Sequence, residues 1–208
     1  MTALNTLFLS NNSISDISSL SSLISISYLE QNNNNISDLS PLQNLDKLTH
    51  LCLLGNQITS TEYLSGLTNL QYLSLAYNSL ESIEYLSNLS NLTVLLLYGT
   101  GIEDISALSG MYLLEYLQLE GNYITDITPL KFLTKLNWLH LGSNRIESVE
   151  PLSYITEQLN YLYLYNNNIS DISYLSQMTG LYHLFLYNNN ISNISALSGM
   201  INLTTLYL

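Results

Sequence analysis

Positively charged residues are scarce in this sequence. Only four lysines and arginines stand against sixteen aspartates and glutamates, which gives the 208 residues a formal net charge of −12. A chain of this charge repels phosphate backbones and anionic lipid surfaces. Nucleic acid is therefore not expected as a partner.

Cysteine and long apolar runs are also lacking. The single cysteine, Cys52, excludes a disulfide within the chain. No apolar run reaches the length of about 18 residues that a membrane span needs, so we expect no membrane insertion. The first residues lack the basic run and apolar stretch of a signal peptide, and we predict none. The sequence indicates no particular cellular compartment.

What the sequence has instead is one pattern that occurs nine times. Its clearest copy spans residues 159–178, and the apolar positions of that copy recur in its neighbours at a spacing of 22 residues. A fixed period of this length is typical of a solenoid, in which each turn buries its apolar side chains against adjacent turns. The hydrophobic share of 47% is sufficient for a core along the whole length.

Each copy begins with a Leu-x-Leu segment, such as the one from Leu73 to Leu75. This alternation predicts a short strand with leucines inside and the intervening side chains outside. Because every turn of a solenoid returns in the same direction, we expect successive strands to be parallel.

An asparagine follows each predicted strand at a constant offset. A buried amide without partners is costly, but asparagine has both donors and acceptors and can bond the backbone of adjacent turns. We therefore predict a buried asparagine ladder rather than a row of surface turn residues. Its members are Asn12, Asn34, Asn56, Asn78, Asn122, Asn144, Asn167 and Asn189, with Thr100 in their place once.

The return segments are predicted to be single helical turns, because so few residues leave room for only one turn of α or 3₁₀ helix. Pro41 and Pro129 mark where two of them begin, and the preceding Ser40 and Thr128 are candidates to cap them. A column of aspartates is expected to help cap these turns and to solvate the convex face. It consists of Asp16, Asp38, Asp104, Asp126 and Asp171.

These motifs resemble the leucine-rich repeat of the 22-residue type. Residues 35–42 and 67–75 are similar to the repeats of bacterial internalins, and residues 141–146 to those of the repeat regulatory subunit of protein phosphatase 1. The resemblance implies an α/β fold, namely a right-handed solenoid with a parallel β-sheet on the concave face and short helical or 3₁₀ turns on the convex face. We expect a single domain over residues 1–208, with about nine repeats and a terminal strand.

Some positions depart from the pattern. Gln31 occupies an inward leucine position, and Thr61 and Thr100 are smaller disturbances. One extra residue between Ile155 and Leu159 lengthens that copy to 23 residues. Neither end has a recognisable polar cap, which favours the interpretation that the chain is part of a longer protein.

The outward strand residues form the predicted concave face. Of its 29 positions, 12 carry Phe, Tyr or Trp and all three histidines lie there, but no lysine or arginine does. Strand propensity also enriches aromatic residues, but the interior is already filled with leucine, so we expect the rings to face water and form an interaction surface. The candidate partner-binding residues are Tyr98, Tyr116, Trp138, His140, Tyr161, Tyr163, Tyr165, His183, Phe185, Tyr187 and Tyr207.

Catalytic, metal and cofactor sites are not predicted. With strands about 4.8 Å apart, His140 lies roughly 19 Å from His50 and about 10 Å from His183, which does not favour a shared metal. Cys52 has no evident base beside it, so a cysteine nucleophile is not expected. Glu30 and Glu120 lie four strands apart and form no carboxylate pair.

The predicted function is a non-enzymatic scaffold that docks a folded protein partner on its aromatic face. Carbohydrate recognition is the alternative, because the rings could stack on sugars while Asn32 and Gln118 supply hydrogen bonds. A phosphatase-regulatory role rests only on the resemblance of residues 141–146.

Overall fold

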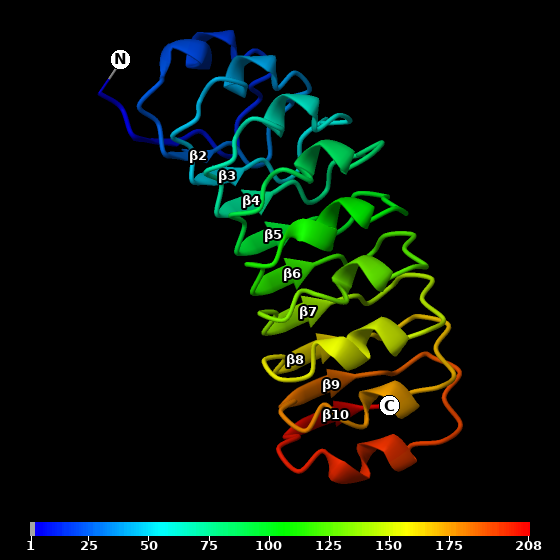
Figure 1. The fold of residues 1–208 in the computed structure, drawn as a ribbon. Helices are drawn as coiled ribbons and strands as arrows, with labels where there is room; N and C mark the ends of the chain where they lie inside the picture. Colours follow the sequence, from blue (N-terminus) through cyan, green and yellow to red (C-terminus); the bar gives the residue numbers. More distant parts are fainter. Residues whose placement is uncertain (1–2) are drawn as a thin grey trace.

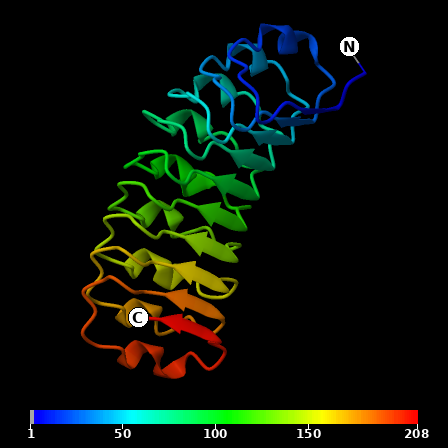
Figure 2. The ribbon, with the colours of Figure 1, turned by 180° about the vertical axis from the view of Figure 1, so that it is seen from behind.

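The fold is a stack of coils around a single parallel sheet. The computed structural model describes residues 3–208, so the first two residues of the predicted domain lie outside it. Ten strands form the sheet in chain order, and every neighbouring pair is parallel, which confirms the prediction. The strands lie along the inner side of a gently curved stack (Figures 1 and 2). They are β1 (Thr6–Phe8), β2 (Tyr28–Glu30), β3 (His50–Cys52), β4 (Tyr72–Ser74), β5 (Val94–Leu96), β6 (Tyr116–Gln118), β7 (Trp138–His140), β8 (Tyr161–Tyr163), β9 (His183–Phe185) and β10 (Thr205–Tyr207).

Short 3₁₀ helices cover the opposite side of the stack. Within residues 3–208, every helical segment is of the 3₁₀ type, as expected for return segments of this length. They are η1 (Ser18–Ser22), η2 (Ser40–Leu42), η3 (Glu62–Leu64), η4 (Glu84–Leu86), η5 (Ser106–Gly110), η6 (Thr128–Leu130), η7 (Glu150–Tyr154), η8 (Ser173–Leu175) and η9 (Ser195–Gly199).

The aspartate column caps five of the helices described in residues 3–208, namely η1, η2, η5, η6 and η8, as predicted. Asp38 Oδ1 accepts a hydrogen bond from the Ser40 amide at 2.8 Å, and Asp126 does the same for Thr128 at 2.8 Å. The expectation that Ser40 and Thr128 are themselves the caps is wrong. Both residues are the first of their helices and receive the capping bond through their backbone.

The leucine columns fill the interior from end to end. The central leucine of each inner strand is completely buried, and the isoleucine or leucine two residues after each ladder position packs into the same core. Burial of such side chains stabilises the folded state by about 25 cal/mol for every Å² of apolar surface withdrawn from water. The central leucines are Leu29, Leu51, Leu73, Leu95, Leu117, Leu139, Leu162 and Leu184.

The asparagine ladder ties each coil to the one before it. The side-chain amide of Asn78 donates to the Leu75 carbonyl at 2.9 Å and to the Leu53 carbonyl of the previous coil at 3.0 Å. Its Oδ1 accepts from the Ile58 amide at 3.0 Å. One side chain thus satisfies three backbone groups that would otherwise be buried without partners.

The ladder is less uniform than predicted. Asn12 is exposed, and its amide bonds only its own turn, through the Leu9 and Ser10 carbonyls. Asn56 and Asn189 are half-buried. At Thr100 two groups replace the missing amide in part: the backbone carbonyl accepts from the Leu80 amide at 3.1 Å, and the hydroxyl donates to the Leu97 carbonyl at 2.9 Å.

Gln31 is fully buried in the leucine column that ends each strand. Within residues 3–208, neither its Nε2 nor its Oε1 has a hydrogen-bond partner. An unsatisfied buried amide costs about 1–3 kcal/mol of folding free energy. We therefore expect the second coil to be less stable than the inner coils.

We expect the substitution Gln31→Leu to raise the free energy of unfolding by about 1–3 kcal/mol, because it restores the leucine column and removes an unpaired amide. Urea unfolding followed by circular dichroism measures this change. In the wild-type chain, amide hydrogens of the first two coils should exchange faster than those of the middle coils.

The exposed Gln71 provides the matched control, and its replacement with leucine should leave stability nearly unchanged. Uniform hydrogen exchange along the chain, together with no gain from Gln31→Leu, would contradict this account of the second coil.

Candidate interaction surface

Outward side chains of adjacent strands stand in columns across the sheet. The register pairs Trp138 with Tyr161 and Tyr163 with Phe185, so the rings repeat at the spacing of the strands. The centroids of Trp138 and Tyr161 are 4.6 Å apart, and those of Tyr163 and Phe185 are 4.7 Å apart with planes only 12° from parallel. The sheet therefore arranges its aromatic residues as stacks.

Three such stacks lie side by side over β6 to β10. The first runs from Tyr116 through Trp138 and Tyr161 to His183. The second runs from His140 to Tyr207, and the third joins Tyr165 to Tyr187. We call these residues the aromatic patch: Tyr116, Trp138, His140, Tyr161, Tyr163, Tyr165, His183, Phe185, Tyr187 and Tyr207.

The rings of the patch are half-buried, and the expectation that they stand freely in water is only partly right. His140 is 8% exposed, whereas Tyr207 is 56% exposed. Stacking covers the ring faces and leaves the edges and hydroxyls outward. Burial raises the pKa of Tyr116 and of Tyr163 above the ordinary value of a phenol. Within residues 3–208, the covered Trp138 Nε1 has no acceptor.

The structure separates one candidate from the others. Tyr98 packs edge-on against Tyr77, with ring centroids 5.0 Å apart, rather than joining a stack of the patch. A second aromatic group, which belongs to the predicted concave face but not to the candidate partner-binding residues, lies near the N-terminus. There Tyr28, His50 and Tyr72 stack in the first column, and Phe8 packs against Tyr28. These side chains alternate with inward leucines along β1 to β4, and this alternation in the sequence indicates that they share one face.

A polar group interrupts the patch at Glu120. Its Oε1 accepts a hydrogen bond from the Tyr165 hydroxyl at 2.6 Å, and its Oε2 lies 3.6 Å from His140 Nε2. Burial lowers the pKa of His140, against the opposing effect of the Glu120 carboxylate, and burial also raises the pKa of Tyr165. Sequence analysis noted Glu120 only as an isolated acid, because its partner is 45 residues away.

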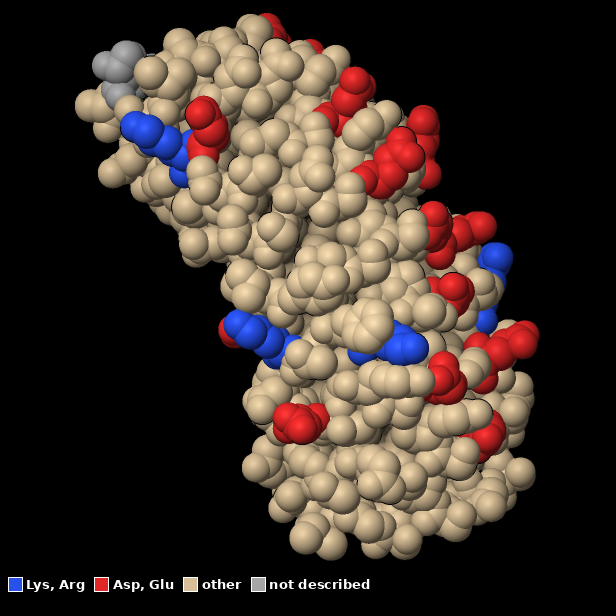
Figure 3. Space-filling view, in the orientation of Figure 1, with Lys and Arg blue, Asp and Glu red and all other residues tan. Residues whose placement is uncertain are grey.

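Most of the other acidic side chains in view lie along the edge opposite the strands (Figure 3). Two of the four basic residues rest on aromatic rings outside the patch. Lys131 Nζ lies 4.2 Å from the ring centroid of Tyr154, and the Arg145 guanidinium lies 4.4 Å from that of Tyr123. Glu120 is therefore the main charged group beside the aromatic patch.

The structure offers little support for other chemistry. Within residues 3–208, no group of three or more histidine, cysteine, aspartate or glutamate side chains could hold a metal ion. No helix in that range is long and apolar enough to cross a membrane. Burial, aided by the Glu30 carboxylate, raises the pKa of the Cys52 thiol to about 11, which disfavours a nucleophile.

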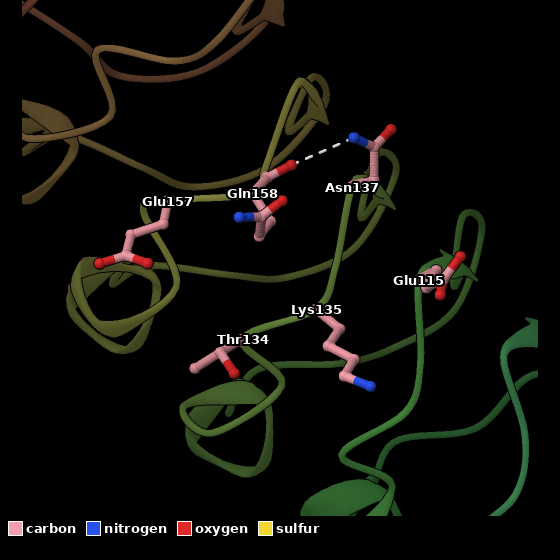
Figure 4. Close-up of a pocket in the computed structure, with 6 residues that line it drawn as sticks. All are labelled: Glu115, Thr134, Lys135, Asn137, Glu157 and Gln158. Atoms are coloured by element: carbon pink, nitrogen blue, oxygen red, sulfur yellow. Dashed lines mark hydrogen bonds between the residues drawn. The ribbon is translucent and has the colours of Figure 1, made fainter.

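A shallow hollow of about 650 Å³ lies beside the N-terminal ends of β6, β7 and β8, next to the coil with the extra residue (Figure 4). The Asn137 amide donates to the Gln158 carbonyl across it at 3.1 Å. The charged ends of Lys135 and Glu157 point apart, so the side chains converge on no common point (Figure 4). The hollow is lined by Glu115, Thr134, Lys135, Asn137, Glu157 and Gln158.

Comparison with known families decides the assignment. The family model for leucine-rich repeats, which describes two copies, matches residues 46–89, 68–110, 90–132, 134–177 and 157–199. The chain belongs to the leucine-rich repeat family. No curated protein matches the sequence.

Solved leucine-rich repeat structures share this architecture. An internalin (inlF) of Listeria monocytogenes is 32% identical, with a TM-score of 0.88 over 99% of this chain and 67% of its own. Internalin C2 (inlC2) of the same species is 33% identical, with a TM-score of 0.84 over 90% of this chain and 82% of its own. The resemblance to internalins is confirmed, whereas the resemblance to the phosphatase subunit stays a prediction.

A plant leucine-rich repeat structure shows the same fold at lower identity. The ectodomain of the membrane receptor kinase GASSHO1/SCHENGEN3 of Arabidopsis thaliana, solved in complex with CASPARIAN STRIP INTEGRITY FACTOR 2, is 24% identical with a TM-score of 0.83. The match covers 100% of this chain and 30% of the receptor chain.

We expect Cys52 of this leucine-rich repeat protein to resist alkylation. A thiol pKa of about 11 leaves roughly a hundredfold less thiolate near pH 8 than an ordinary cysteine has. Iodoacetamide labelling followed by mass spectrometry compares the native protein with the urea-unfolded protein, which serves as the control. A native rate equal to the unfolded rate would show that Cys52 is an available nucleophile.

Proposed function

We propose that this chain is a non-enzymatic scaffold that binds a folded protein partner through the aromatic patch. The observation that carries the proposal is the continuity of the patch, in which three columns of rings lie side by side over five strands. Exposed aromatic surfaces of this kind are typical of interaction sites, and tyrosine and tryptophan dominate interface energetics.

The stacked arrangement also favours binding on entropic grounds. Each inner ring is held on both faces, as Tyr163 is by His140 at 4.7 Å and by Phe185 at 4.7 Å. Side chains already fixed in place lose little rotamer freedom when a partner docks. The patch therefore offers rigid edges and hydroxyl groups rather than flexible side chains.

Stacking weakens the case for the carbohydrate alternative. A sugar ring binds on the open face of an aromatic ring, but neighbours within each column cover the faces of Trp138, Tyr161 and Tyr163. Tyr207, at 56% exposure, is the most open ring of the patch. A protein partner that contacts ring edges and hydroxyls fits this geometry better than a glycan does.

The two alternatives separate in a direct comparison. A pull-down with partner identification by mass spectrometry, set beside a glycan array, tests protein against carbohydrate binding. We expect a protein partner whose capture depends on the patch and no glycan signal that depends on it. A glycan signal lost on Trp138→Ala, with no protein captured, would favour the alternative.

We expect Trp138→Ala or Tyr163→Ala to weaken binding of the identified partner at least tenfold, about 1.4 kcal/mol, because each removes a ring from the middle of the patch. Isothermal titration calorimetry measures the affinity, and circular dichroism confirms that each variant is folded. Asp104→Ala, outside the sheet and exposed, is the control and should bind normally. If Asp104→Ala abolished binding while both aromatic truncations had no effect, the patch would not be the binding surface.

A further inference from the structure

Glu120 is the one acidic residue among the predicted outward positions of β6 to β10, and it lies beside the aromatic patch. The other acid of the predicted face, Glu30, lies on β2, four strands away, and none of the 29 outward positions is lysine or arginine. The Glu120 side chain is 41% exposed, so it is open to a partner that covers the patch.

One oxygen of this carboxylate is fixed and the other is available. Oε1 accepts the short hydrogen bond from the Tyr165 hydroxyl at 2.6 Å. Oε2 lies 3.6 Å from His140 Nε2, which is beyond ordinary hydrogen-bond distance. The second oxygen therefore retains its capacity to accept from an incoming donor.

The nearest potential cation does not neutralise this charge. The His140 side chain is only 10% exposed, its ring stacks on Tyr163, and burial lowers its pKa. A neutral imidazole leaves the charge of Glu120 without a counter-ion when a partner displaces water from the patch. A buried carboxylate is costly under these conditions unless the partner supplies the cation.

Gly142 makes the arrangement possible. A Cβ at this position would lie 2.8 Å from Tyr165 Cζ and 2.9 Å from its Cε2, so the Tyr165 ring occupies the space that any other residue would fill. From that position the hydroxyl reaches from the coil of β8 across β7 to Glu120. Gly142 and Tyr165 are therefore positioning residues for the carboxylate.

We propose that Glu120 anchors an arginine of the protein partner that docks on the aromatic patch. This inference rests on the proposed function. A planar guanidinium pairs with a carboxylate through directed, charge-assisted hydrogen bonds, whereas an ammonium is a compact and strongly hydrated charge.

A phage-displayed random-peptide library is the probe. Among the peptides that bind the wild-type chain, we keep those whose binding is reduced by Trp138→Ala or Tyr163→Ala. These peptides are ligands of the patch. We expect arginine to be enriched among these peptides relative to the unselected library. The strongest peptide is then synthesised in two forms, one with arginine and one with neutral citrulline in its place.

The affinities of both forms for three proteins test the contact. On the wild-type chain, citrulline should weaken binding about tenfold or more, and on Glu120→Gln, which keeps the size of the side chain, by less than about twofold. Glu103→Gln removes an exposed charge outside the sheet and should behave as the wild type does. Circular dichroism verifies the fold of each variant.

Two glycine variants test the positioning. Gly142→Ala displaces the Tyr165 ring and should reduce the preference for arginine over citrulline several-fold, although Glu120 is still present. Gly110→Ala is the matched control, because its Cβ would meet no atom within 4 Å. An unchanged preference in Gly142→Ala would refute the positioning role of Gly142.

The outcomes distinguish this inference from the function on which it rests. Patch-dependent peptides without arginine enrichment, or an equal loss with citrulline on the wild type and on Glu120→Gln, would overturn the arginine contact and leave docking on the patch intact. If the library gave no peptide whose binding depended on Trp138 or Tyr163, the arginine contact would be overturned, whereas the pull-down and the aromatic truncations decide docking of a folded partner independently.

Discussion

The hydrogen bonds of the asparagine ladder are the interaction on which the rest of the molecule depends. Each inner amide bonds its own turn and the previous one, as Asn144 does through the Leu141 and Leu119 carbonyls at 3.1 and 2.9 Å. These contacts leave little freedom for one coil to slip along its neighbour, because a shift would bury unpaired backbone groups. The strands therefore remain in register, and everything carried by the strands is ordered with them.

The aromatic patch is a direct consequence of that register. Parallel strands about 4.8 Å apart bring outward side chains at matching positions to nearly the thickness at which rings stack. The phenyl and phenol rings of Phe185 and Tyr207, for example, have centroids 4.9 Å apart and planes 9° from parallel. The same geometry that packs leucine on leucine inside the solenoid thus assembles ring on ring outside it.

The features that repeat could be predicted from the sequence, and those that do not repeat could not. The parallel strands, the capping aspartates and the burial of Gln31 each follow from a sequence column in which several copies place a residue in the same environment. Asn12 is exposed, and at Thr100 a backbone carbonyl accepts the hydrogen bond that an asparagine side chain accepts elsewhere. Both exceptions arise where a coil differs from its neighbours. The contact of Tyr165 with Glu120 depends on the absence of a side chain at Gly142. The repeat pattern does not show that another ring fills this space, so the contact could not be predicted from it.

The position of the one tryptophan in the sequence has a further consequence. Trp138 lies between Tyr116 and Tyr161, with ring centroids 5.3 and 4.6 Å away, in the middle of the aromatic patch. All of the indole fluorescence of the chain therefore originates from this surface, and the flanking phenols are close enough to transfer their excitation to it. The molecule contains its own optical reporter, whose emission reflects the polarity of the patch and any molecule that covers it.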